Sequence, residues 1–154
     1  AYTGTHDNMP FRGHLDELDE QGITTATRDI LVQATVLNVP LPASLDLTKM
    51  VGKGETKEKA IQHKVDYLES LPASAFLGKR TSLLTKVAVR SLLMSRARLA
   101  MIPMQDILAL GADARMNTPA LVSEGNWSWR VSPSALTDDL ADALKRDLKR
   151  AKRV

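Results

Sequence analysis

Only two short segments of this 154-residue chain have the composition of β-strands, and predicted helices fill most of the sequence between them. The first segment, residues 1–7, is rich in Tyr and Thr, and the second is the apolar run 99–103. Strands that alternate with helices predict a parallel sheet in an α/β protein. Two parallel strands cannot form a free-standing core, and the sequence opens without Met directly on a motif, so we expect a segment of a larger protein.

The composition excludes several classes of protein. Hydrophobic residues make up 44% and charged residues 25%, which excludes collagen-like and strongly disordered chains. The absence of Cys excludes a disulfide framework and thiolate metal ligands and fits a reducing compartment. No run approaches the ~18 apolar residues of a membrane span, and the polar opening is unlike a signal peptide. We therefore expect a cytoplasmic protein that does not bind membranes.

The net charge of +3 resides mainly in the last predicted helix. Residues 136–154 hold six Lys or Arg against four Asp and so contribute +2. A nucleic-acid module would pair such basic residues with stacking aromatic side chains, which this helix lacks. Acidic residues in its first turns and basic residues in its last complement the helix dipole. A solvated amphipathic helix is favoured, and a basic helical binding module is a remote alternative.

Apolar residues at helical spacing predict four longer helices. Thr27, Thr56 and Thr137 are expected to cap three of these helices, and Thr81 is expected to open the remaining one. The first helix should end near Asn38, the second at Pro72 and the third near residue 97. Asp106 is expected to cap a single helical turn that Gly111 closes.

His6 and Asp7 stand at the end of the first predicted strand, where enzymes built on parallel barrels place catalytic groups. A carboxylate there can meet a substrate beside an imidazole donor, although Asp7 could equally cap the next turn. His6, Asp7 and His14 supply too few ligands at this spacing for a metal site, and we expect no metal or organic cofactor. Asp106 follows the second strand, but its expected capping role already explains it.

Asn117 lies in the loop after the second predicted strand, at the same end of the expected sheet as Asp7. Its amide can both donate to and accept from sugar hydroxyls. Trp127 and Trp129 could stack on sugar rings, but their alternate spacing is more typical of two core anchors, one buried and one half-buried.

Four motifs together resemble those of the 4-α-glucanotransferases (amylomaltases or disproportionating enzymes, glycoside hydrolase family 77) of the α-amylase clan. They are Tyr-Thr-Gly-Thr-His-Asp-Asn at 2–8, Pro-Met-Gln-Asp-Ile-Leu-x-Leu-Gly at 103–111, Ala-Arg-Met-Asn-Thr-Pro at 114–119 and Gly-Asn-Trp-Ser-Trp-Arg at 125–130. The stretch 13–98 carries little of the pattern. Met9 and Pro10 stand where many members have Asp-Thr, and His14 where an aromatic is common, which bears on acceptor specificity.

The resemblance implies the C-terminal part of a (β/α)8 barrel. Residues 1–131 would supply strands 7 and 8 with outer helices, including a helical insertion at roughly 27–71. Residues 132–154 would be a C-terminal amphipathic helix that completes the barrel. The nucleophile and the acid/base carboxyl would lie in the remainder of the enzyme, so this segment alone is expected to be inactive.

The implied activity is the retaining transfer of an α-1,4-glucan segment from a donor to the 4-hydroxyl of an acceptor glucan or glucose. Asp7 matches the carboxylate that grips the 2- and 3-hydroxyls of the reacting sugar and stabilises the transition state. By the same resemblance His6 contacts that sugar and Asn117 binds a neighbouring donor glucose. The expected partners are maltooligosaccharides, α-1,4-glucans and the remainder of the enzyme, with no nucleic acid. An α-glucan hydrolase of the same clan is the alternative.

Overall fold

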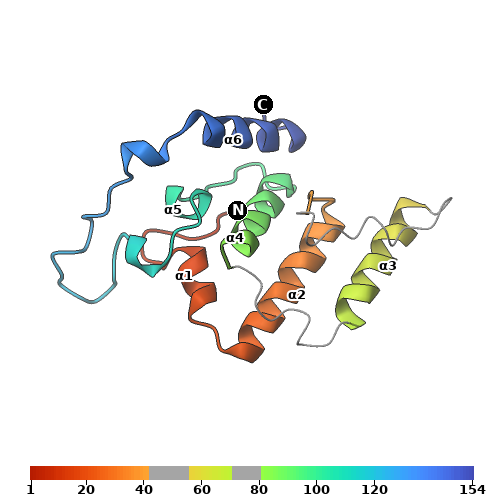
Figure 1. Ribbon diagram of the computed structural model, residues 1–154, viewed down its shortest axis with the longest axis horizontal. Coiled ribbons are helices and arrows are strands. Elements are labelled where there is room, and N and C mark those ends of the chain that lie inside the picture. The colour runs from red at the N-terminus through yellow and green to blue at the C-terminus, as the bar shows by residue number, and fades with distance from the viewer. Residues whose placement is uncertain (42–55, 71–80) are drawn as a thin grey trace.

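The computed structural model describes residues 1–41, 56–70 and 81–154 (Figure 1). This part of the chain is helix-rich. Its elements are α1 (Phe11–Asp16), α2 (Glu20–Val36), α3 (Lys57–Ser70), α4 (Thr81–Met94), α5 (Met104–Ile107), the 3-10 turns η4 (Ala112–Ala114) and η5 (Pro133–Ala135), and α6 (Asp138–Arg150).

The two expected strands meet only as one parallel bridge, between Tyr2 and Met101. The Ala1 amino group donates to the Leu99 carbonyl at 2.8 Å, and the Met101 amide donates to the Ala1 carbonyl at 2.9 Å. The predicted parallel adjacency is confirmed, but the prediction of two strands is wrong for the described residues. A two-stranded parallel pair is weak when its faces are uncovered, and here Tyr2 and Met101 are 65% and 62% exposed.

Helix α4 lies at the centre of the structure and packs against α1, α2, α5 and α6 (Figure 1). Leu84 and Val87 on this helix are fully buried. Val87 joins Ala34 of α2 and Val39 in one apolar cluster. The apolar circumference of α4 predicts such burial, and the prediction is confirmed. Helix α3 packs on α2, on the side away from the site described below (Figure 1).

Two of the predicted N-caps are confirmed. The Thr137 hydroxyl accepts a hydrogen bond from the Leu140 amide at 3.2 Å, and the Thr56 hydroxyl accepts one from the Lys59 amide at 3.4 Å. Thr81 is the first residue of α4. The predicted helix end at Pro72 lies outside the described residues.

The prediction that Thr27 caps its helix is wrong. Helix α2 begins earlier, at Glu20, and its N-cap is Asp19, whose carboxylate accepts from the Gly22 amide at 2.8 Å. Thr27 is buried inside the helix, and its hydroxyl donates to the Ile23 carbonyl at 2.7 Å. An intrahelical bond of this kind lets Thr occupy a helix interior, so the residue does not mark a boundary.

The predicted capping role of Asp106 is also wrong, because this residue lies inside α5, where Pro103 is the N-cap. Its buried carboxylate bridges to the other end of the chain. One oxygen accepts from the Phe11 amide at 2.7 Å and the other accepts from the Thr3 hydroxyl. The carboxylate thus supplies the acceptor that Pro10, the N-cap of α1, lacks. It ties both ends of segment 3–11 to α5.

The C-terminal segment docks on α4. Arg90 of α4 forms an ion pair with Asp147 of α6, with 2.8 Å between Nε and Oδ2. Beyond α6, the Arg153 guanidinium donates to the carbonyls of Leu93, Ser95 and Ala97. The helix predicted at the C-terminus is confirmed as α6, and Arg153, one of the basic residues of this segment, contacts the protein.

Candidate functional site

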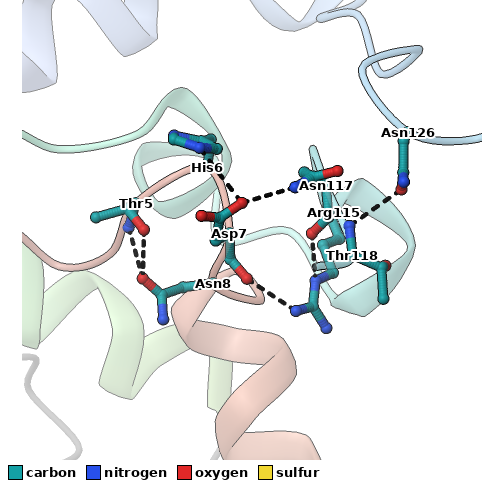
Figure 2. Close-up of polar contacts among 8 residues, drawn as sticks. All are labelled: Thr5, His6, Asp7, Asn8, Arg115, Asn117, Thr118 and Asn126. Atoms are coloured by element: carbon teal, nitrogen blue, oxygen red, sulfur yellow. Dashed lines mark hydrogen bonds and ion pairs between the residues drawn. The ribbon is translucent and has the colours of Figure 1, made fainter. Parts of the chain in front are cut away.

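The structure brings together the three residues that sequence analysis singled out, His6, Asp7 and Asn117 (Figure 2). The Asn117 side-chain amide donates to Asp7 Oδ1 at 2.7 Å, across 110 residues of sequence. His6 Nε2 lies 3.3 Å from the same oxygen. The side chains of His6 and Asp7 are 55% and 47% exposed, so this polar group is open to a ligand.

A tight turn presents Asp7. Asn8 Oδ1 accepts from both the main-chain amide and the hydroxyl of Thr5, at 2.9 and 2.7 Å. The main-chain amide of Asn8 donates to the Thr5 carbonyl at 3.0 Å. This is the local side-chain bonding for which Asn is favoured in turns. Asn8 therefore stabilises the turn, and the Asp7 carboxylate reaches out to Asn117 instead of capping the chain that follows it (Figure 2).

Arg115 joins the loop of Asp7 to the loop of Asn117. Its Nη2 donates to the Asp7 carbonyl at 2.8 Å, and its Nε donates to the Asn117 carbonyl at 2.7 Å (Figure 2). Sequence analysis quoted this residue only as part of a motif and gave it no role. The available signal was its position two residues before Asn117, in a loop expected to approach Asp7.

The loop that carries Asn117 is closed on itself. The Thr118 amide donates to Asn126 Oδ1 at 3.0 Å, while the Asn126 side-chain amide donates to the Leu121 carbonyl at 2.8 Å. The Trp127 amide adds a bond to the Met116 carbonyl at 2.7 Å. These bonds fix the backbone on both sides of Asn117, and Asn126 is a second residue that sequence analysis left without a role.

The expectation that both Trp residues are core anchors is wrong for Trp127, because this residue is 53% exposed. Its backbone has a φ of 62°, and its indole ring lies 5.0 Å from the His6 ring between centroids. The chain turns at this residue and carries the indole to the site loop instead of into the helical core. Trp129 is half-buried, as expected for one member of the pair.

His6 also borders two open cavities. One, of about 220 Å³, extends along the loop past Thr5 and Met9 toward Met116. The other, of about 530 Å³, lies over the bridged segments and is lined by Tyr2, Met101 and Ile102 among others. Both are mainly apolar, and His6 is the residue of the polar group that lines them.

The titratable residues of the described segments include no group of three His, Cys, Asp or Glu side chains placed to hold a metal ion. His14, the third candidate ligand, is exposed on α1. None of the described helices is long and apolar enough to cross a membrane.

Comparison with known proteins finds a family model that matches most of the chain. The family model described as 4-alpha-glucanotransferase matches residues 1–137. A chloroplastic/amyloplastic 4-alpha-glucanotransferase of Arabidopsis thaliana is 32% identical over 140 residues, which are 91% of this chain and 16% of that protein. The chloroplastic/amyloplastic 4-alpha-glucanotransferase of Solanum tuberosum is 54% identical over 55 residues, covering 36% of this chain and 9% of that protein.

The fold has a relative among solved structures. Amylomaltase from Streptococcus agalactiae in complex with acarbose superposes with a TM-score of 0.60 at 22% identity, over 99% of this chain and 21% of that one. The chain therefore spans only about a tenth to a fifth of the length of these relatives.

Proposed function

This chain belongs to the 4-α-glucanotransferase family, and from that premise we propose that it supplies one side of the active site of a retaining 4-α-glucanotransferase. The reaction would move an α-1,4-glucan segment from a donor to the 4-hydroxyl of an acceptor glucan or glucose. The proposal rests on one observation: His6 and Asn117 both contact Oδ1 of the Asp7 carboxylate, and Asn117 does so across 110 residues of sequence.

In a retaining mechanism the reacting sugar flattens toward an oxocarbenium ion, and hydrogen bonds to its hydroxyls strengthen as it does so. Interactions that strengthen in the transition state raise the turnover rate. Asp7 is proposed to make these bonds to the 2- and 3-hydroxyls. Its contacts with Asn117 and His6 both reach Oδ1, which leaves Oδ2 to accept from a sugar hydroxyl.

His6 and Asn117 are proposed to bind sugar beside Asp7. The Asn117 amide uses one N–H on Asp7, so a second N–H and the amide oxygen remain for the hydroxyls of a neighbouring donor glucose. The half-exposed imidazole of His6 can contact the sugar that Asp7 holds. Neither role requires a metal or an organic cofactor.

The place of the chain in the enzyme is part of the same proposal. We assign residues 1–131 to the C-terminal part of the (β/α)8 barrel, with segments 1–7 and 99–103 as strands 7 and 8. Their parallel bridge and the 65% exposure of both Tyr2 and Leu99 support this, because further strands would cover those side chains. Residues 132–154 would complete the barrel, and the remaining protein would supply the nucleophile and the acid/base. The helical insertion expected at roughly 27–71 lies partly outside the described residues, and within them its first helix already begins at Glu20.

The proposed partners are maltooligosaccharides and α-1,4-glucans, and the proposed compartment is the cytoplasm. The lack of Cys supports a reducing compartment. The two plant relatives named above are described as chloroplastic/amyloplastic, a description that belongs to those proteins.

Product analysis of the full-length protein tests the proposal. With maltotriose as the only substrate, transfer yields glucose together with a ladder of longer chains, whereas hydrolysis yields only shorter ones. We expect the ladder. Shorter products alone would replace the transferase with the α-glucan hydrolase of the same clan, and unchanged maltotriose would contradict both.

A further inference from the structure

We propose that Arg115 is a positioning residue that sets the orientation of the Asp7 carboxylate through the backbones of Asp7 and Asn117. This inference rests on the proposed function and deepens it. Arg115 would touch no sugar itself. It would determine how the Asp7 carboxylate is oriented toward the reacting sugar, because its guanidinium holds together the two loops that carry Asp7 and Asn117.

The geometry forms a closed ring of contacts. The side chains of Asp7 and Asn117 are joined by a hydrogen bond of 2.7 Å. The main-chain carbonyls of the same two residues are joined through Arg115, by bonds of 2.8 Å from Nη2 and 2.7 Å from Nε. A single hydrogen bond would act as a hinge between the loops. Two separate connections between the same two residues also fix the angle at which the carboxylate is presented.

The chemistry of the guanidinium suits this role. It is planar, always charged, and carries its N–H donors in a rigid fork, so two of them point in fixed directions. A Lys ammonium is a compact point charge on a flexible stem and cannot hold two carbonyls at a set angle. The Arg115 side chain is only partly exposed, which limits competition from water for these carbonyls.

The remaining contacts of the two loops leave the orientation of the Asp7 carboxylate to Arg115. Asp106 ties segment 3–11 down at Thr3 and Phe11, on either side of Asp7 but not at it. Asn126 and Trp127 fix the other loop at Thr118 and Met116, on either side of Asn117 but not at it. Among the described residues at the tips of the two loops, two hydrogen bonds cross between them, the Arg115 Nη2 bond to the Asp7 carbonyl and the Asp7–Asn117 bond. The rings of His6 and Trp127 also meet across the loops, with 5.0 Å between centroids, but this contact does not act on the Asp7 main chain.

A misplacement of about 1 Å at a reacting centre can cost on the order of 100-fold in rate. In the full-length protein we therefore expect Arg115→Ala to lower kcat about 10- to 100-fold with a smaller change in KM, because Asp7 acts mainly in the transition state. Arg115→Lys should retain the charge and the fold but recover only part of the loss. Guanidinium ion at millimolar concentration should rescue Arg115→Ala partly.

The matched control is Arg153→Ala. Arg153 also donates to main-chain carbonyls of a distant segment, those of Leu93, Ser95 and Ala97, 56 to 60 residues away, but it contacts none of the site residues. We expect Arg153→Ala to lower Tm while leaving kcat and KM near those of wild type. If Arg115→Ala and Arg153→Ala each lose activity only in proportion to their loss of folded protein, Arg115 is structural and the proposal is wrong.

A double-mutant cycle gives the sharpest readout. Once Asn117→Ala has removed the side-chain bond, Arg115→Ala should cost clearly less than it does in the wild-type background, since the pair it orients is already broken. Two results would overturn the proposal. One is an equal loss of activity in the two backgrounds without guanidinium rescue. The other is a kcat within about 2-fold of wild type for both Arg115→Lys and Arg115→Ala. Failure of the proposed function is distinguishable, since then wild-type protein would not elongate maltotriose.

Discussion

The side-chain amide of Asn117 donates to Asp7 Oδ1 at 2.7 Å, although the two residues lie in loops 110 residues apart in the sequence. The loops meet because the segments before them run parallel and adjacent, bridged at Tyr2 and Met101. Parallel segments present their carboxyl ends at the same edge, and that edge is where ligands bind in barrels and open α/β sheets. The fold thus accounts for the position of the site.

Asn117→Asp tests the polarity of that bond with almost no change in side-chain shape. The amide donor becomes a second carboxylate, and like charges about 3 Å apart repel and disfavour the ionised pair. We expect glucan transfer by the full-length protein to fall further in Asn117→Asp than in Asn117→Ala, which removes the donor without adding charge. Initial rates with maltotriose measure this difference. Asn117→Asp activity equal to wild type would contradict the assigned contact.

Asp106→Ala tests the buried carboxylate that anchors segment 3–11. It would leave the Phe11 amide and the Thr3 hydroxyl without their acceptor. An unsatisfied buried polar group costs about 1–3 kcal/mol, so we expect an unfolding free energy lower by roughly 2–4 kcal/mol, measured by urea denaturation. Asp106→Asn should cost less, because the Thr3 hydroxyl can rotate to accept from the new amide.

The control for Asp106 is Asp113→Ala, which truncates an exposed carboxylate on η4. Surface changes of this kind stay within about 0.5 kcal/mol. Similar losses in Asp106→Ala and Asp113→Ala would mean that the buried bridge contributes little.

Gly13→Ala tests the packing of α1 against η4. A Cβ at Gly13 would lie 2.8 Å from the Ala112 amide nitrogen, a main-chain atom that cannot move away cheaply. Overpacking at such a position costs typically about 1–3 kcal/mol, and we expect a corresponding drop in stability on urea unfolding. Gly125→Ala is the matched control, because its Cβ would meet nothing closer than the Ser123 hydroxyl at 3.5 Å. A Gly13→Ala protein as stable as the control would contradict the close approach.

Much of the helical framework follows from local sequence. The apolar period of α4 predicts its burial, and Thr137 marks the start of α6 by the hydrogen bond that its hydroxyl makes. Thr27 misleads, because its hydroxyl bonds to the Ile23 carbonyl inside α2. The true start at Asp19 lies within an acidic run that is equally typical of a solvated loop.

A site residue is predictable from the sequence when it stands in a recognisable motif. It is less predictable when its role depends on partners that are distant in the sequence. His6, Asp7 and Asn117 follow from motifs and from the expected parallel order. The role of Asp106 depends on donors 95 and 103 residues away, which no local pattern reveals. The role of Arg115 is hidden for the same reason, since its partner at Asp7 is 108 residues distant.

The most direct test of the Asp7 assignment is the transfer rate of the full-length protein carrying Asp7→Asn. The control is Asp113→Asn, which makes the same change at an exposed carboxylate. Removing a group that stabilises charge in the transition state costs on the order of 100- to 1000-fold in kcat. We predict a loss of that size for Asp7→Asn with Tm unchanged, and wild-type activity for Asp113→Asn. An Asp7→Asn enzyme that elongates maltotriose at a rate near that of wild type would contradict the assignment of Asp7.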